Sequence, residues 1–126
     1  MNLANYFDKV EGIGVLGTAD STGKVDLAIY ARPHVIDDQT VAFIMGDHLS
    51  HDNIEANPRA AYLFIERAEG YRGLRMYLTK TLEETDPQRI EAMRRKGRRD
   101  EDSTPKNAFL VHFKVDEVRP LVGSIV

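Results

Sequence analysis

The polar side chains between residues 46 and 54 form the segment of this chain best suited to binding chemistry. The segment contains His48, Ser50, His51 and Asn53, and it follows an apolar, β-prone stretch at residues 41–45. Ser50 is a favourable N-cap, so we expect a helix to begin there. A helix N-terminus at the end of a strand presents unpaired backbone N–H groups and the positive end of the helix dipole. This arrangement suits an anion such as a phosphate group.

The same segment has a second interpretation as a metal site, because His48 and His51 are flanked by Asp47 and Asp52. A three-residue spacing lets two histidines bind one ion only if both lie on one helical turn, and no third or fourth ligand is evident. We therefore expect polar turn residues beside a phosphate here, with no metal ion.

Alternation and turn signals around this segment predict a mainly β chain with three short helices. The helices are expected at residues 3–10, 50–57 and 87–96, with Asp86 as the N-cap of the last and Gly97 as its stop. The strands are expected at residues 13–19, 24–31, 34–36, 40–45, 60–66, 74–82 and 107–115, with a loop at residues 98–106. Short connections between so many strands favour an antiparallel barrel, in one domain covering residues 1–126.

Two expectations depend on which face of a strand is covered. Val25, Leu27 and Ile29 alternate with other residues along their strand, so we expect the face that they share to be buried. His112 alternates with apolar neighbours on both sides, so we expect it at the surface or in an interface.

Composition excludes several classes of protein. The chain has no cysteine, so it has neither a disulfide framework nor a thiolate nucleophile. No apolar run approaches the roughly 20 residues that span a bilayer, and the first residues lack the pattern of a secretory signal. A net charge of −3 gives no reason to expect nucleic acid binding by the whole surface. We expect a cytoplasmic protein without a membrane or nucleic acid partner.

One basic run, residues 94–99, could contact nucleic acid phosphates. Asp100, Glu101 and Asp102 follow it directly and largely cancel its charge, and no aromatic residue is interleaved to stack on a base. Local ion pairs are therefore the favoured interpretation of the run.

Three segments follow one another in an order typical of one family: GVLGTADSTGKVDLAIYARP, SHDNIEANPRAAYLFIE and GLRMYLTKTLEETDPQRIEA. The second contains an Asn-x-x-x-Asn-Pro-Arg core at Asn53, Asn57, Pro58 and Arg59. With these segments the chain resembles the pyridoxamine 5′-phosphate oxidase-like, FMN-binding split-barrel family. The resemblance implies a split β-barrel, a homodimer, and FMN held at the subunit interface.

Carried onto this sequence, the resemblance implies two regions of contact with FMN. The flavin ring and ribityl chain would lie along Tyr30, Ala31, Arg32 and Pro33 and along the strand that contains Phe43 and Met45. The phosphate would meet the turn and helix start at His48, Ser50, His51 and Asn53.

The chain departs from the family in the phosphate turn, where close relatives carry a lysine or arginine and this chain has Leu49 and Ser50. Loss of one charge-assisted hydrogen bond weakens binding by about 1.5–3 kcal/mol, or roughly ten- to a hundredfold in affinity. Arg32 is the candidate for tuning the flavin, because a cation near the N1–C2=O edge stabilises reduced, anionic flavin. The alternative is that Arg32 only neutralises a surface carboxylate.

No paired acid and base stand out as catalytic residues, and a bound flavin itself accepts or donates the hydride. The resemblance therefore implies an FMN-dependent oxidoreductase acting on a small substrate. Two alternatives stay open. One is a non-enzymatic electron carrier or sensor, and the other is a barrel that binds another planar molecule, such as haem or a deazaflavin.

Overall fold

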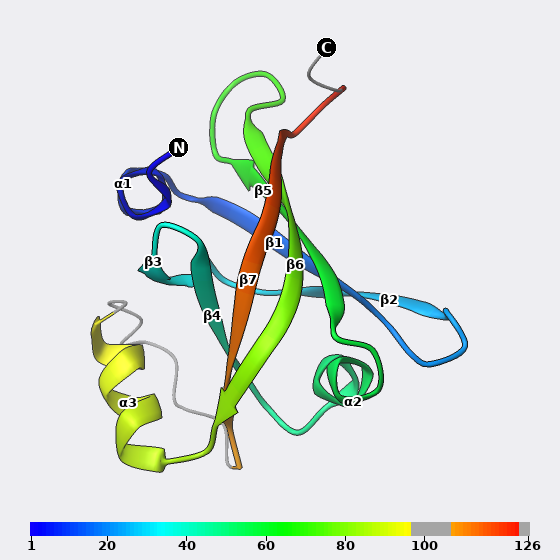
Figure 1. The fold of residues 1–126 in the computed structure, drawn as a ribbon. Helices are drawn as coiled ribbons and strands as arrows, with labels where there is room; N and C mark the ends of the chain where they lie inside the picture. The colour runs from blue at the N-terminus through cyan, green and yellow to red at the C-terminus, as the bar shows by residue number, and fades with distance from the viewer. Residues whose placement is uncertain (97–106, 124–126) are drawn as a thin grey trace.

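The computed structural model describes residues 1–96 and 107–123, which contain seven strands and three helices (Figure 1). The strands are β1 (Gly12–Ala19), β2 (Val25–Ile29), β3 (His34–Asp37), β4 (Thr40–Met45), β5 (Arg59–Glu66), β6 (Gly73–Glu84) and β7 (Phe109–Pro120). The helices are α1 (Leu3–Lys9), α2 (Leu49–Ala56) and α3 (Pro87–Lys96). The predicted mainly β fold is confirmed, while the predicted helix stop at Gly97 and the loop at residues 98–106 lie outside the described residues. None of the described helices is long and apolar enough to cross a membrane.

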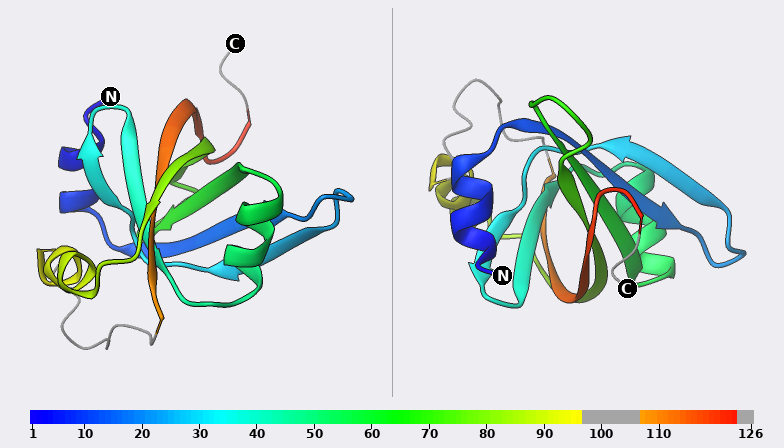
Figure 2. Two further views of the ribbon diagram at one scale, coloured as in Figure 1. Left: turned by 60° about the horizontal axis from the view of Figure 1, so that its bottom comes forward. Right: turned by 90° about the horizontal axis from the view of Figure 1, so that it is seen from above.

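All seven strands belong to one antiparallel sheet in the order β2-β1-β5-β6-β7-β4-β3. The two edge strands, β2 and β3, are consecutive in the chain and are joined by residues 30–33. In a flat sheet, strand spacings of about 4.8 Å would separate these edges by about 29 Å. The five steps from Ile29 to His34 span at most about 18 Å. The sheet therefore curls until its edges approach each other, and Figure 2 shows the resulting barrel from two directions.

The barrel interior is filled by large apolar side chains, several of them aromatic. Tyr62 and Phe64 on β5 and Phe113 on β7 are fully buried. Helix α1 packs against this core through Phe7, whose ring meets that of Phe64 edge to face with 5.5 Å between centroids. Burial of each such side chain contributes about 1.5–3 kcal/mol, so the interior supplies most of the stability of the fold.

Two turn and cap predictions are confirmed. The carboxylate of Asp20 accepts hydrogen bonds from the backbone N–H groups of Thr22 and Lys24, which fixes the turn between β1 and β2. The carboxylate of Asp86 accepts from the Gln88 N–H at 3.0 Å, as an N-cap does, and α3 begins at Pro87. Helix α3 then covers part of the outer face of the sheet.

The prediction that the face of Val25, Leu27 and Ile29 is buried is wrong. These side chains are 74%, 73% and 72% exposed. Leu27 is paired with Gly17 of β1, and Gly17 is paired with Ala61 of β5, so the three strands share one outward face. Alternation marks β2 as two-sided, but it does not say on which side the core lies.

The prediction of a surface or interface position for His112 is also wrong for this chain, because His112 is only 6% exposed. It does point away from the barrel interior, as alternation predicts. Helix α3 covers that face with Ile90 and Met93, which form a second apolar cluster with Ala42 and Leu110. The buried imidazole is hydrogen bonded to Glu84, with 2.6 Å between Nε2 and Oε2.

Candidate functional site

Residues 30–33, the first predicted contact region, cross the gap between the edge strands of the barrel. The buried Tyr62 hydroxyl lies 3.2 Å from the carbonyl oxygen of Tyr30 and 3.1 Å from that of Ala31, and donates to them. The Tyr30 ring packs edge to face on Phe43, with 5.8 Å between centroids. A side chain from the core therefore fixes the backbone of this crossing segment. Sequence reasoning did not identify Tyr62.

Gly14 is what allows Tyr62 to reach the crossing segment. A Cβ atom at Gly14 would lie 1.8 Å from the Tyr62 hydroxyl oxygen and 2.4 Å from the carbonyl oxygen of Tyr30. A glycine within a β-prone run is the sequence signal of such a close approach, and it is present in the stretch from Ile13 to Leu16.

Arg32 is held at the C-terminal end of α1. One guanidinium nitrogen, Nη1, donates to the carbonyl oxygens of Phe7 at 2.7 Å and Val10 at 2.8 Å. Carbonyls at a helix C-terminus carry partial negative charge, so a cation is favourable there. These contacts give Arg32 a structural role. The sequence had suggested two other roles, tuning a flavin or neutralising a surface carboxylate. The role of Arg32 toward a flavin stays a prediction.

The structure places Phe43 and Met45 inside the barrel, where they are 2% and 0% exposed. Pro33, in the crossing segment, is buried as well, while Ala31 is exposed. The side chains of Phe43 and Met45 therefore support the site from beneath, and the crossing segment is the part of this region that reaches the surface.

The second predicted region, at the start of α2, has a different N-cap from the one that the sequence predicts. The N-cap is His48, which makes no side-chain capping hydrogen bond, and the helix begins at Leu49. The prediction that Ser50 is the N-cap is wrong. Ser50 is 5% exposed and lies beside the Tyr30 hydroxyl. Burial raises the pKa of Tyr30, and hydrogen bonding with Ser50 opposes that rise.

His51 and Asn53 both point into the protein. The Asn53 amide donates to the Thr18 hydroxyl at 3.0 Å. The His51 ring stacks on Phe109 with 3.7 Å between centroids and 9° between planes. Its Nε2 lies 2.8 Å from Glu83 Oε1 and 3.1 Å from Glu55 Oε1.

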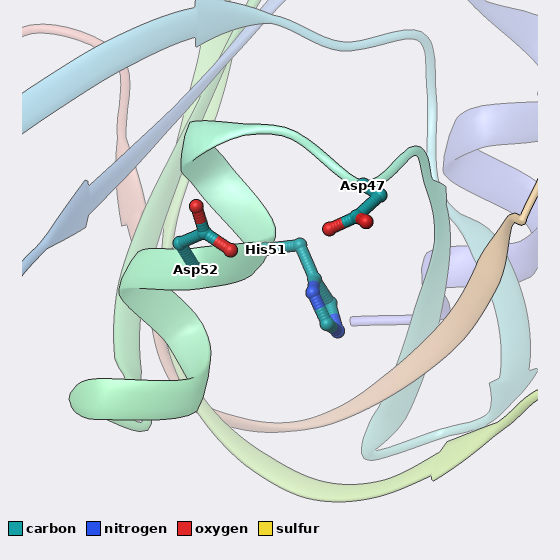
Figure 3. A group of neighbouring side chains, drawn as sticks. All are labelled: Asp47, His51 and Asp52. Atoms are coloured by element: carbon teal, nitrogen blue, oxygen red, sulfur yellow. The ribbon is translucent and has the colours of Figure 1, made fainter.

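Two groups of described side chains bring three possible metal ligands within 4.8 Å of one another, and His51 belongs to both. Figure 3 shows the first group, in which the His51 ring projects from α2 toward the sheet between Asp47 and Asp52. The second group joins His51 to Glu55 and Glu83. The structure therefore brings possible ligands to His51 that were not evident from the sequence, and neither group includes His48.

The Lys80 ammonium group supplies positive charge to the second of these groups. Its nitrogen lies 3.2 Å from Glu83 Oε1 and 3.6 Å from Glu55 Oε2. Burial raises the pKa of Glu83, but hydrogen bonds from His51 and Lys80 outweigh that effect and hold it below its ordinary value. Lys80 is thus paired with both carboxylates, and we assign no metal ion to them.

The predicted site residues therefore divide into two groups, one connected to the crossing segment and one turned away from it. Ser50 joins the start of α2 to Tyr30 and so to the crossing segment. His51 and Asn53 are turned toward Glu83 and Thr18 in the protein interior. Of the residues predicted around the phosphate, His48 is the one that is exposed.

Comparison with solved structures identifies the fold. An FMN-binding protein from Syntrophomonas wolfei matches 94% of this chain and 83% of its own, with a TM-score of 0.75 and 17% identity. HupZ from Group A Streptococcus matches 98% of this chain and 93% of its own, with a TM-score of 0.73 and 21% identity. HutZ, the heme storage protein of Vibrio cholerae, matches 95% of both chains, with a TM-score of 0.70 and 16% identity.

The same fold occurs in pyridoxamine 5′-phosphate oxidase-like proteins and in an F420 reductase. No protein-family model matches the sequence, and neither does any curated protein. The chain has the split-barrel fold of the FMN-binding proteins, as the sequence resemblance predicts.

Proposed function

We propose that this chain is an FMN-binding flavoprotein that exchanges electrons with a small substrate. The flavin ring would lie along residues 30–33, and the phosphate would lie at the start of α2. When bound, FMN supplies the hydride or electron chemistry, and the protein binds and orients it. A cytoplasmic location stays a prediction.

The observation that carries this proposal is the fold, which matches that of an FMN-binding protein with a TM-score of 0.75 over 94% of this chain. Ser50 in the first turn of α2 lies beside the Tyr30 hydroxyl of the crossing segment, so one ligand could contact both. The N-cap His48 makes no side-chain capping bond, which leaves the first-turn N–H groups without a cap from that side chain. Backbone N–H groups at a helix start bind phosphate together with the helix dipole.

The charges around this turn set the expected affinity. Asp47 and Asp52 are exposed and flank the first turn of α2, where they oppose the approach of a phosphate dianion. Leu49, at the first helical position, is 55% exposed and offers no charge. We therefore expect FMN to bind more weakly than it would if a cation stood at position 49.

We also propose that the protein is a homodimer. The shared outward face of β1, β2 and β5 carries Val25, Leu27 and Ile29 beside Ile13 and Ile65, all at least 40% exposed. A contiguous apolar face of this kind is typical of a protein interface. A second copy of the chain is the partner that the family resemblance implies.

Haem is the second candidate ligand, and one observation bears on it. The described residues include all four histidines, and His34, His51 and His112 are buried. His48 is exposed at the turn before α2. Of the four histidines, His48 is the exposed one and is therefore our candidate for an axial ligand of haem.

An absorption spectrum of the purified protein, before and after adding FMN and removing the excess, tests the proposal. Retained oxidised-flavin absorbance supports FMN, and a colourless protein that does not bind FMN contradicts it. Leu49→Lys should tighten FMN binding about tenfold by adding one charge-assisted contact, while Leu49→Glu should weaken it. Equal affinities for the two variants would mean that the phosphate lies elsewhere.

The same titrations separate FMN from haem. If haem binds through His48, His48→Ala should abolish the Soret band of the haem-loaded protein. The Leu49 variants should then leave haem affinity almost unchanged, because an axial ligand bond does not depend on charge at position 49. FMN binding should survive His48→Ala, since the main phosphate contacts are expected from backbone N–H groups.

A further inference from the structure

A pocket of about 400 Å³ lies between α1, β3 and α3. Its walls come from α1, the end of the crossing segment, β3 and α3 (Figure 1). Its lining residues are Ala4, Phe7, Asp8, Arg32, Pro33, His34, Val35, Ile36, Arg89, Met93 and Lys96. A volume of this size falls in the lower part of the range for small-molecule sites.

The charge of the lining is strongly unequal. Among the lining residues that the structure describes, Arg32, Arg89 and Lys96 are cationic, and Asp8 alone is acidic. Arg89 has one carboxylate partner beyond the lining, Glu84, at 3.4 Å from its Nε. A concave surface lined mainly by one sign of charge focuses the field into the pocket and favours a ligand of opposite sign.

The position of Arg32 is fixed by the fold. Its Nη1 is held by the carbonyl oxygens of Phe7 and Val10, which orient the side chain without cancelling its formal charge. Such a preorganised cation loses little conformational freedom when it meets an anion. Arg89 and Lys96 lie on the exposed side of α3 and can adjust to the ligand.

Apart from His34, the remaining walls are apolar. Phe7 and Met93 are nearly fully buried, while Ile36, at 37% exposure, stands at the rim. Val35 and Pro33 complete the apolar part. A ligand that satisfies the pocket therefore carries both a negative group and an apolar body.

We propose that this pocket is a second binding site, specific for a small organic anion that joins a carboxylate, sulfonate or phosphate group to an apolar ring or chain. The site is separate from the α2 start proposed for the flavin phosphate, and it does not depend on flavin binding. It shares only Arg32 and Pro33 with the predicted flavin contacts.

The test uses the fluorescent anion 8-anilinonaphthalene-1-sulfonate, with the uncharged N-phenyl-1-naphthylamine as its comparison. Methyl NMR of Met93 and Ile36 reports whether the sulfonate enters this pocket and not another apolar surface. The expected result is that the sulfonate shifts both methyl signals and that the uncharged compound does so at least about tenfold more weakly. Unshifted methyl signals, or equal affinities for the two compounds, would overturn the proposal.

The variant for this test is Arg89→Glu/Lys96→Glu, which reverses two exposed charges at the pocket. Arg67→Glu/Arg95→Glu is the matched control, because it makes the same change in net charge at exposed residues that do not line the pocket. The first double variant should bind the sulfonate at least about tenfold more weakly, and the control should bind within about twofold of the parent. Equal weakening in both would show that only net charge matters and would contradict a specific site.

Two further measurements keep the proposal testable if the charge variants lose stability. Ile36→Trp places bulk at the rim without altering charge, and it should also reduce binding of the sulfonate. FMN affinity should be unchanged in Arg89→Glu/Lys96→Glu. Joint loss of FMN and sulfonate binding in that variant would mean a single site and would contradict a separate one.

Discussion

The outer face of the sheet is covered at one end and open at the other. At the β4 and β7 end, α3 lays Ile90 and Met93 over Ala42 and Leu110. At the β1, β2 and β5 end, Leu27 and its neighbours on β2 stand exposed, and no described element covers them. Both ends carry apolar side chains. This chain therefore provides its own cover for one end and leaves the other exposed, and we propose that a second copy of the chain covers it.

The largest expected difference between the two ends is in the stability of the single chain. Ile90→Ala removes a side chain that is 1% exposed and should lower the free energy of unfolding by about 2–5 kcal/mol. Leu27→Ala should change it by less than about 1 kcal/mol in dilute protein, because the side chain already faces solvent. Urea unfolding at low protein concentration measures both. Equal losses would contradict the assignment of covered and open ends.

Self-association should show the opposite ranking. Leu27→Asp places a carboxylate in the centre of the open face and should raise the dimer dissociation constant at least about a hundredfold. Ser21→Asp, at the exposed turn between β1 and β2, is the control and should leave the constant nearly unchanged. Sedimentation equilibrium measures the change. A dimer that persists in Leu27→Asp would show that the interface lies on another surface.

Two glycines on β1 allow the same comparison between the inner and the outer face of one strand. Gly14→Ala would force a Cβ atom against the Tyr62 hydroxyl and a backbone carbonyl, and it should cost about 1–3 kcal/mol. At Gly17, on the open face, the nearest atom is Leu27 Cδ2 at 3.3 Å, so Gly17→Ala should change stability by less than about 1 kcal/mol. Thermal unfolding of the two variants measures both changes in stability. Equal destabilisation would contradict the expected difference between the inner and the outer face of β1.

The smallest expected effect is the pH dependence of the covered end. The hydrogen bond from His112 holds the pKa of Glu84 below its ordinary value of 4.5. A lowered folded pKa adds stability that is present above about pH 4.5 and is lost as the pH falls through the folded pKa. Glu84→Gln should therefore reduce the fall in the melting temperature between about pH 5 and pH 3. Glu69→Gln, in an exposed loop, should keep the full fall, and an unchanged profile in both variants would contradict this account.

Much of the fold could be predicted from local signals in the sequence. Asp20 and Asp86 act through hydrogen bonds to residues two to four positions away, so their turn and cap are readable without tertiary information. The order of elements also carried the family resemblance. The face assignment of Leu27 failed because alternation does not say on which side of β2 the core lies. The assignment of His112 failed because it depends on where α3 packs, and alternation contains no information about a distant cover.

The candidate site was harder to predict than the fold. Ser50 has the residue type of an N-cap, but the helix starts one residue earlier and Ser50 turns inward to Tyr30. Glu83, the hydrogen-bond partner of His51, lies on β6, 32 residues away in sequence, so the proximity of the two side chains appears only in three dimensions. The role of Tyr62 depends likewise on the curl of the whole sheet.

Glu83 and Glu84 have a consequence for how the sheet assembles. They are adjacent on β6, so their side chains leave the strand on opposite faces, one toward His51 of α2 and the other toward His112 of β7. A slip of β6 by one residue would exchange these faces and separate each carboxylate from its histidine. Misaligned pairing of β6 thus loses a carboxylate–histidine contact on each face. The two neighbouring carboxylates therefore favour the native register of β6 during folding.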